Sequence, residues 1–237
     1  TVEVFDVANG GVRTIYQNET PSLIAQGAPH YLYWAPGGEY LAFLVSSPAA
    51  FVLMVADLSD AGGGQLKAPD LVQTGAPLYF HWGQGGDQIL LHTRDEVKLT
   101  ARPFDAGPST LLAVGQGFRV AALSPAGQAF AYTAANSNGT GASLFIAGIG
   151  TPDSGSAILD VGPLSAFAWS PDGSQLAVVE GGGPGGSGFQ RLVVIPAAGA
   201  PAKTLAEEEV IAFFWSPAGD TIAWVTVDPQ DRMLEWK

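Results

Sequence analysis

One short pattern recurs five times along the chain of 237 residues, and it limits the possible folds more than any other feature. Each copy has a large apolar residue, then a small residue, then a turn that ends in glycine. The copies are placed by Trp34, Trp82, Leu123, Trp169 and Trp215, at intervals of 41 to 48 residues. Repeats of about 40–50 residues are typical of the four-stranded blades of a β-propeller. The pattern therefore predicts that architecture.

The turn in each copy joins two short apolar runs. Proline presets φ for a turn, and glycine adopts the positive φ that closes it. The turn prolines are Pro36, Pro125, Pro171 and Pro217, and the turn glycines are Gly38, Gly86, Gly127, Gly173 and Gly219. The flanking runs are rich in Val, Leu, Phe, Tyr and Trp and are too short for helices, so each copy predicts a β-hairpin.

Two further and more polar runs follow each hairpin, as outer strands of a blade should. The expected third strands cover residues 51–58, 96–104, 143–149 and 191–196, and the expected fourth strands cover residues 71–74, 110–114, 157–161 and 203–206. The sequence therefore predicts an all-β fold of four-stranded antiparallel blades.

The two ends of the chain predict incomplete blades. Residues 2–7 and 12–16 resemble a third and a fourth strand with no first pair, and residues 233–236 resemble a third strand with no fourth. The N-terminal strands belong either to a sixth blade whose first half is missing or to the last blade. We favour one propeller domain over residues 1–237, a portion of a longer chain with about six blades.

The fourth repeat follows a known family pattern more closely than the other copies do. The string Trp169-Ser-Pro-Asp-Gly173, followed by Gln175-Leu-Ala-Val178, resembles the WD40-like (PD40) repeats of TolB-like propellers and of the propeller domains of prolyl-oligopeptidase-like peptidases. Other copies depart from it. Gly85-Gly86 replaces Pro-Asp-Gly in the second copy, and Leu123 replaces tryptophan in the third. The resemblance implies a bacterial, extracytoplasmic and often periplasmic propeller that binds proteins.

Composition narrows the classes of partner. The formal net charge of −12 repels phosphate backbones and anionic membrane surfaces, so neither nucleic acid nor such a membrane is expected as a partner. The chain has no cysteine, which excludes disulfides and Cys-ligated zinc. No apolar run is long enough to span a bilayer as a helix. The acidic surface favours solubility or the attraction of basic partners.

The residues that follow the repeat are interpreted as structural, because a binding residue should break the repeat symmetry. His81 breaks it, since the other copies carry Tyr33, Ala122, Ala168 and Phe214 at its position. His81 could line a central channel and bind a metal or an anion, although a histidine held in place by hydrogen bonds is the favoured interpretation. Too few aligned His, Asp or Glu residues accompany it to predict a metal site or a cofactor.

Other motifs predict little chemistry. Gly181, Gly183 and Gly186 match a dinucleotide-binding pattern, but Pro184 and the strand that follows indicate a hairpin loop, because the dinucleotide site needs a helix there. The Asn18 and Asn138 sequons carry little weight, and no catalytic motif is present. The loops over residues 17–28, 46–50, 135–141, 181–188 and 228–232 are expected on one face, where binding residues often lie.

Two functional hypotheses follow. The first is a non-catalytic propeller that binds or scaffolds proteins as a domain or subunit of a larger extracytoplasmic assembly. The alternative is a propeller that accompanies a hydrolase or peptidase, or a metal-dependent hydrolase that works in the channel. The alternative predicts carboxylates clustered with His81 around the channel mouth, or a hydrolase domain encoded before Thr1 or beyond Lys237. A carbohydrate-binding propeller ranks lower, because the loops are mainly Gly, Ser and Asn.

Overall fold

The computed structural model describes residues 1–18, 26–59, 67–114, 121–135, 141–162, 165–181, 189–199, 201–228 and 233–237. Almost all of the regular structure in these ranges is β-strand, with one short 3₁₀ helix, η1 (Phe104–Ala106). The chain divides into two compact units, Thr1–Phe118 and Arg119–Lys237.

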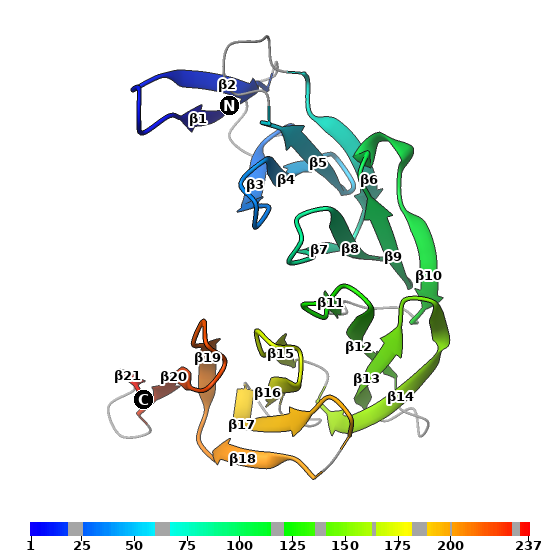
Figure 1. Ribbon diagram of the computed structural model, residues 1–237, viewed down its shortest axis with the longest axis vertical. Coiled ribbons are helices and arrows are strands. Elements are labelled where there is room, and N and C mark those ends of the chain that lie inside the picture. The colour runs from blue at the N-terminus through cyan, green and yellow to red at the C-terminus, as the bar shows by residue number, and fades with distance from the viewer. Residues whose placement is uncertain are drawn as a thin grey trace. The chain divides into compact units, whose positions relative to one another are not determined.

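The first unit contains three antiparallel sheets whose strands follow one another in chain order (Figure 1). The N-terminal sheet has two strands, β1 (Val2–Phe5) and β2 (Val12–Tyr16). The second sheet comprises β3 (Pro29–Trp34), β4 (Tyr40–Ser46), β5 (Phe51–Asp57) and β6 (Asp70–Gly75). The third comprises β7 (Leu78–Trp82), β8 (Gln88–Thr93), β9 (Glu96–Ala101) and β10 (Ser109–Ala113).

The second unit also contains three antiparallel sheets in chain order. The first comprises β11 (Ala121–Leu123), β12 (Ala129–Ala135), β13 (Ala142–Gly148) and β14 (Thr151–Val161). The next comprises β15 (Ala166–Trp169), β16 (Gln175–Gly181), β17 (Phe189–Pro196) and β18 (Lys203–Ala206). The last has three strands, β19 (Val210–Trp215), β20 (Ile222–Val227) and β21 (Leu234–Trp236).

These sheets confirm the predicted all-β fold of four-stranded antiparallel blades. Most predicted strands lie within two residues of the observed bounds, and two differ by more. The strand expected over 96–104 ends at Ala101, because the chain turns into η1 and buries Phe104 against the rings of Tyr40 and Trp82. The strand expected over 157–161 already begins at Thr151, and register shifts let this longer strand follow β13.

All five repeat turns share one hydrogen-bonding pattern. The N–H of the turn glycine donates to the carbonyl three residues earlier, at 2.8–2.9 Å in every copy. The five glycines have φ between 67° and 76°, a left-handed conformation that side chains other than glycine adopt with strain. Local turn chemistry therefore sets each hairpin, independently of the packing around it.

The repeat tryptophans link each sheet to the one before it in the chain. The indole Nε1–H of Trp82 donates to the carbonyl oxygen of Tyr33 at 3.1 Å, from β7 to β3. Trp169 donates in the same way to Ala122 at 3.1 Å, and Trp215 donates to Ala168 at 3.2 Å. In each case the acceptor is the residue just before the aromatic or leucine position of the preceding copy. Leu123 is buried at that position but has no N–H donor.

The turns of successive sheets also touch. A Cβ placed on Gly173 would lie 3.2 Å from Cδ of Pro125, and one on Gly219 would lie 3.2 Å from Cδ of Pro171. The corresponding distance from Gly86 to Cδ of Pro36 is 3.7 Å. The turn glycine of one sheet therefore packs on the turn proline of the sheet before it.

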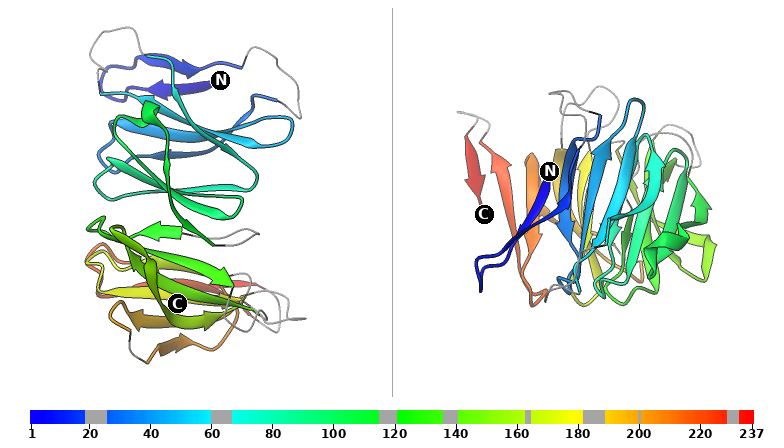
Figure 2. Two further views of the ribbon diagram at one scale, coloured as in Figure 1. Left: turned by 90° about the vertical axis from the view of Figure 1, so that its right-hand side faces the viewer. Right: turned by 90° about the horizontal axis from the view of Figure 1, so that it is seen from above.

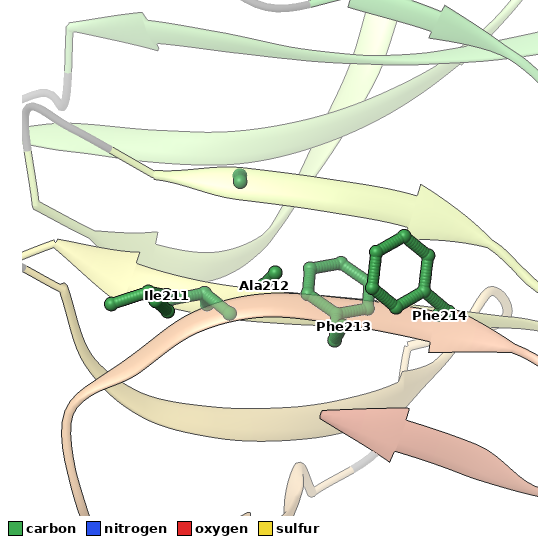
Figure 3. Close-up of a pocket in the computed structure, with 6 residues that line it drawn as sticks. Ile211, Ala212, Phe213 and Phe214 are labelled. Carbon is green, nitrogen blue, oxygen red and sulfur yellow. The ribbon is translucent and has the colours of Figure 1, made fainter. Parts of the chain in front are cut away.

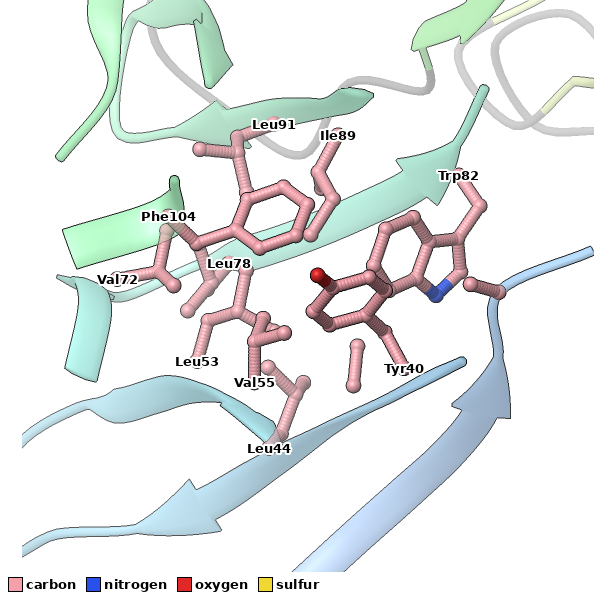
Figure 4. Packing of buried hydrophobic residues seen from close by; sticks show 12 residues of the cluster. Tyr40, Leu44, Leu53, Val55, Val72, Leu78, Trp82, Ile89, Leu91 and Phe104 are labelled. Carbon is pink, nitrogen blue, oxygen red and sulfur yellow. The ribbon is translucent and has the colours of Figure 1, made fainter. Parts of the chain in front are cut away.

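Apolar cores fill the space between sheets within each unit. In the first unit, Leu44, Leu53 and Val55 pack against Ile89 and Leu91 of the next sheet (Figure 4). The sheet β1–β2 lies over the other face of β3–β6 (Figure 2), where Val2 and Ile15 join a cluster that includes Leu41, Phe43 and Val45. In the second unit, Leu144, Leu176, Val178 and Val193 belong to one such cluster.

The indole hydrogen bond yields a stability prediction. We expect Trp82→Phe to lower the free energy of unfolding by about 1–3 kcal/mol, because the carbonyl of Tyr33 loses its donor and part of the buried ring is lost. The measurement is urea denaturation of the 237-residue chain. Trp236→Phe is the matched control, since Trp236 is exposed on β21. Equal midpoints for the two variants would contradict the assigned role of the bond.

The turn of the fourth copy also holds a carboxylate by hydrogen bonds. The Ser170 hydroxyl donates to Oδ1 of Asp172 at 2.6 Å, the Ser174 N–H donates to Oδ1 at 3.0 Å, and the Ser174 hydroxyl donates to Oδ2 at 2.7 Å. These donors favour the ionised form and lower the pKa of Asp172 to about 2.

We therefore expect the contribution of Asp172 to stability to depend on pH. A lowered folded-state pKa stabilises the fold above the ordinary pKa of 3.8, and this stabilisation is lost as the pH falls towards 2. The urea midpoints of the native chain and of Asp172→Asn should differ most near pH 7 and should converge between about pH 4 and pH 2. A constant difference over this range would exclude the expected linkage.

Candidate functional site

An aromatic pocket of about 710 Å³ lies in the first unit, and we call it the β3–β7 pocket. Strands β3 and β7 are the first strands of neighbouring sheets, and each is an edge strand of its own sheet. The aromatic lining residues on these two strands include Tyr31, Tyr33, Trp34, Tyr79 and Phe80. Leu44, Phe51, Pro77 and Leu78 complete an apolar wall.

The side chains of the pocket are arranged by an irregularity in β3. The register of β3 on β4 shifts between His30 and Tyr33, and Tyr31 has φ of +49°. A tyrosine rarely adopts this left-handed conformation, and such bulges re-aim side chains next to binding sites. Tyr33 then meets Phe80 in a T-shaped contact with ring centroids 5.9 Å apart. Tyr33 remains 58% exposed, so it stands at the mouth of the pocket.

His81 lines the same pocket from β7. It pairs with Leu90, whereas its neighbour Trp82 pairs with Ile89 and faces the core between β3–β6 and β7–β10. Nδ1 of His81 is buried and makes no hydrogen bond with the described residues, so the interpretation of a histidine held in place by hydrogen bonds finds no support at this atom. Burial lowers the pKa of His81 from 6.5 to about 4, which keeps the imidazole neutral near pH 7.

The lining of the β3–β7 pocket favours recognition of apolar and aromatic groups. Tyrosine hydroxyls and the neutral imidazole of His81 supply its polar atoms, and none of the lining residues named for it is a carboxylate. Carboxylates clustered with His81, which the hypothesis of a hydrolase acting in the channel predicts, are therefore not part of this lining. Among the described residues, no group of three or more His, Asp or Glu side chains is placed to hold a metal ion.

A smaller pocket of about 210 Å³ lies in the second unit, where Phe213 and Phe214 of β19 meet β15 and β16 (Figure 3). Ile211 and Ala212 of β19, with Ala166 and Val179, form the rest of its wall. Its lining carries no titratable side chain, so it offers space for an aliphatic group and no chemistry.

Several candidate positions from the sequence lie outside the described residues. These are Gly183 and Gly186 of the glycine-rich loop, Glu19 and Thr20 of the first sequon, the whole second sequon at Asn138, and most of the expected binding loops. The described part of the chain contains no helix of the length and apolarity needed to cross a bilayer.

The repeat pattern does not reveal that Tyr31, Tyr33 and Phe80 line a pocket. The run Tyr31-Leu32-Tyr33-Trp34 fits the apolar pattern of a strand in the first hairpin, so it was assigned a packing role. The aromatic content gives no signal, because the second and fifth copies also carry three aromatic residues within the four positions before the turn.

Burial of His81 generates a second pH prediction. A folded-state pKa below the ordinary value means that the unfolded chain binds the proton more tightly, so stability falls as the pH drops from about 6.5 to about 4. We expect His81→Phe, which copies the residue at Phe214, to weaken this pH dependence of the urea midpoint. An identical slope in the variant would show that His81 titrates as an exposed histidine.

Comparisons with known proteins bear on the fold. No model of a known protein family matches the chain, and no curated protein matches it either. Among solved structures, TolB from Acinetobacter baumannii is similar with a TM-score of 0.59 and 16% identity, over 99% of this chain and 56% of that protein. The chain thus spans little more than half the length of this relative.

Two further structures point the same way. A putative TolB from Agrobacterium tumefaciens has a TM-score of 0.59 and 15% identity, over 96% of this chain and 78% of that one. An oligogalacturonate lyase in complex with manganese has a TM-score of 0.61 and 12% identity, over 86% of this chain and 63% of that one. At these identities the likeness is one of fold, and it supports a β-propeller with about six blades.

Proposed function

We propose that the chain is a non-catalytic, protein-binding β-propeller, and that it binds its partner through the β3–β7 pocket. The observation that carries the proposal is the aromatic lining of this pocket, about 710 Å³ in volume, on two adjacent edge strands. Tyrosine and tryptophan are the residues most enriched at the energetic centres of protein interfaces. The fold supports the proposal, since propellers present such surfaces without requiring catalysis.

The rim of the pocket favours a protein over a small ligand. Tyr31, Leu32 and Tyr33 are all exposed large hydrophobic residues in one continuous run. A small molecule inside the pocket would leave most of this run in water, whereas a polypeptide segment that crosses the rim would cover it. The occupant we propose is a segment of a partner protein that inserts an apolar or aromatic side chain into the pocket, against the rings of Tyr33 and Phe80.

Charge defines the partner further. The chain carries a formal net charge of −12, which accelerates encounter with a basic protein and slows encounter with an acidic one. We therefore propose that basic residues flank the inserted apolar side chain. The TolB-like fold supports an extracytoplasmic location, with the propeller as a domain or subunit of a larger assembly.

The test is capture of partners by the tagged chain from its native cells, comparing Tyr33→Ala with Phe5→Ala. The two residues are matched, because they are 58% and 59% exposed, but Phe5 lies on β1 outside the pocket. We expect at least one protein to be retained by the native chain and by Phe5→Ala and lost with Tyr33→Ala. For that protein the dissociation constant should rise at least about tenfold with Tyr33→Ala, as for an interface residue worth more than about 1 kcal/mol.

Two outcomes would overturn the proposal. One is a set of captured proteins that is the same for both variants, which would place binding elsewhere on the chain. The other is equal loss with both variants, which would indicate a general effect on the fold. Weaker capture at higher salt is the expected signature of a basic partner.

A further inference from the structure

We propose that β1–β2 is the outer half of a four-stranded blade, and that its inner half is a β-hairpin with a sixth copy of the repeat. This hairpin docks on Trp34 and Gly38, and its source is the same polypeptide, directly before β1 in strand order. Trp34 also lines the β3–β7 pocket, but the hairpin would dock on the face of β3 where Trp34 pairs with Leu41. The proposed partner contacts Tyr33, which pairs with Ala42 in a different core.

The first argument is the Trp34 indole. The tryptophans at the same position in three later copies donate to a carbonyl of the preceding sheet at 3.1–3.2 Å. The structure gives the Trp34 indole no such bond with the described residues. Trp34 is 50% exposed, whereas Trp82, which has a first strand beside it, is 8% exposed. The same side chain in the same turn therefore lacks the neighbour that the other copies have.

The second argument is Gly38, the turn glycine of the same copy, which also lacks the contact made by the glycines of later turns. A Cβ placed on the glycine of three later turns would lie 3.2–3.7 Å from Cδ of the proline in the preceding turn. A Cβ on Gly38 would meet no atom within 4 Å. Two contacts that recur together elsewhere are thus absent together here, and both would be made by one repeat hairpin with a proline in its turn.

The third argument is the pairing of β1. In each complete sheet the third strand pairs with the second on one side and with the fourth on the other. Strand β1 pairs with β2 alone among the described strands, so it has an open edge where a second strand would pair. Every complete sheet runs in chain order, which places the missing first and second strands immediately ahead of β1 in the same polypeptide.

The apolar core between β1–β2 and β3–β6 continues towards Trp34. Val2 and Ile15 already cover Leu41 and Phe43 on one face of the sheet β3–β6. Trp34 pairs with Leu41, so its side chain lies on this face, beyond the part that β1 and β2 cover. The hairpin would extend an interface that exists and would bury the exposed indole.

The experiment supplies the hairpin. The chain's own residues 166–181, which contain the complete Trp-Ser-Pro-Asp-Gly copy, are fused ahead of Thr1 through a linker copied from residues 47–50, the loop between β4 and β5. The readout is solvent exchange of the Trp34 indole N–H by NMR, assigned with Trp34→Phe. The control is a fusion of the same residues in scrambled order.

We expect the fused hairpin to slow exchange of the Trp34 indole at least about tenfold relative to the unfused chain, while the scrambled fusion leaves it unchanged. The midpoint of thermal unfolding should rise with the hairpin, and rise less when the fusion also carries Trp34→Phe.

An indole that exchanges as fast in the hairpin fusion as in the scrambled one would overturn the proposal. Protection of Trp34 in the unfused chain that grows with protein concentration would overturn it too, since the cover would then come from a second copy of the chain.

Discussion

The hydrogen bond from a repeat indole to a carbonyl of the preceding sheet is the interaction on which each stack of sheets depends. The first strand of every sheet is an edge strand, so half of its backbone groups have no partner in the ladder. Trp82, Trp169 and Trp215 each place a large ring over that edge and donate to one of its carbonyls. One side chain therefore supplies both apolar burial and polar satisfaction, which explains why tryptophan recurs where another large residue would fill the same volume.

The third copy shows what remains when the donor is lost. Leu123 is buried like Trp82, so the hydrophobic contribution of the position persists. The leucine side chain has no N–H, however, so this copy cannot make the indole bond. The turn itself is intact, since Gly127 has φ of 67° and donates to Ser124 at 2.8 Å. Hairpin formation and attachment to a neighbouring sheet are thus separate properties of the repeat.

Local chemistry explains how much of the fold the sequence could predict. The proline–glycine turns specify hairpins wherever they occur, so the strands around them were placed within a few residues. The end of β9 and the start of β14 were wrong, because they depend on the tertiary burial of Phe104 and on bulges that no local pattern encodes. The pocket was missed for a related reason. Trp34 and Trp82 are equivalent in sequence, yet they differ in exposure by 50% against 8%, a difference that only their neighbours determine.

The pocket also lies where the repeat is least symmetric, and this connects the fold to the proposed function. Residues that follow the repeat are committed to turns and to contacts between sheets, so changing them disturbs the scaffold. Two residues break the repeat and are not needed for its turns or its contacts between sheets. Tyr31 has a positive φ, and His81 stands where the other copies carry Tyr, Ala or Phe. A left-handed tyrosine and a buried imidazole nitrogen both cost free energy in the isolated chain. A partner that packs on the tyrosine would offset part of those costs, and this favours the β3–β7 pocket as the binding site in an otherwise structural repeat.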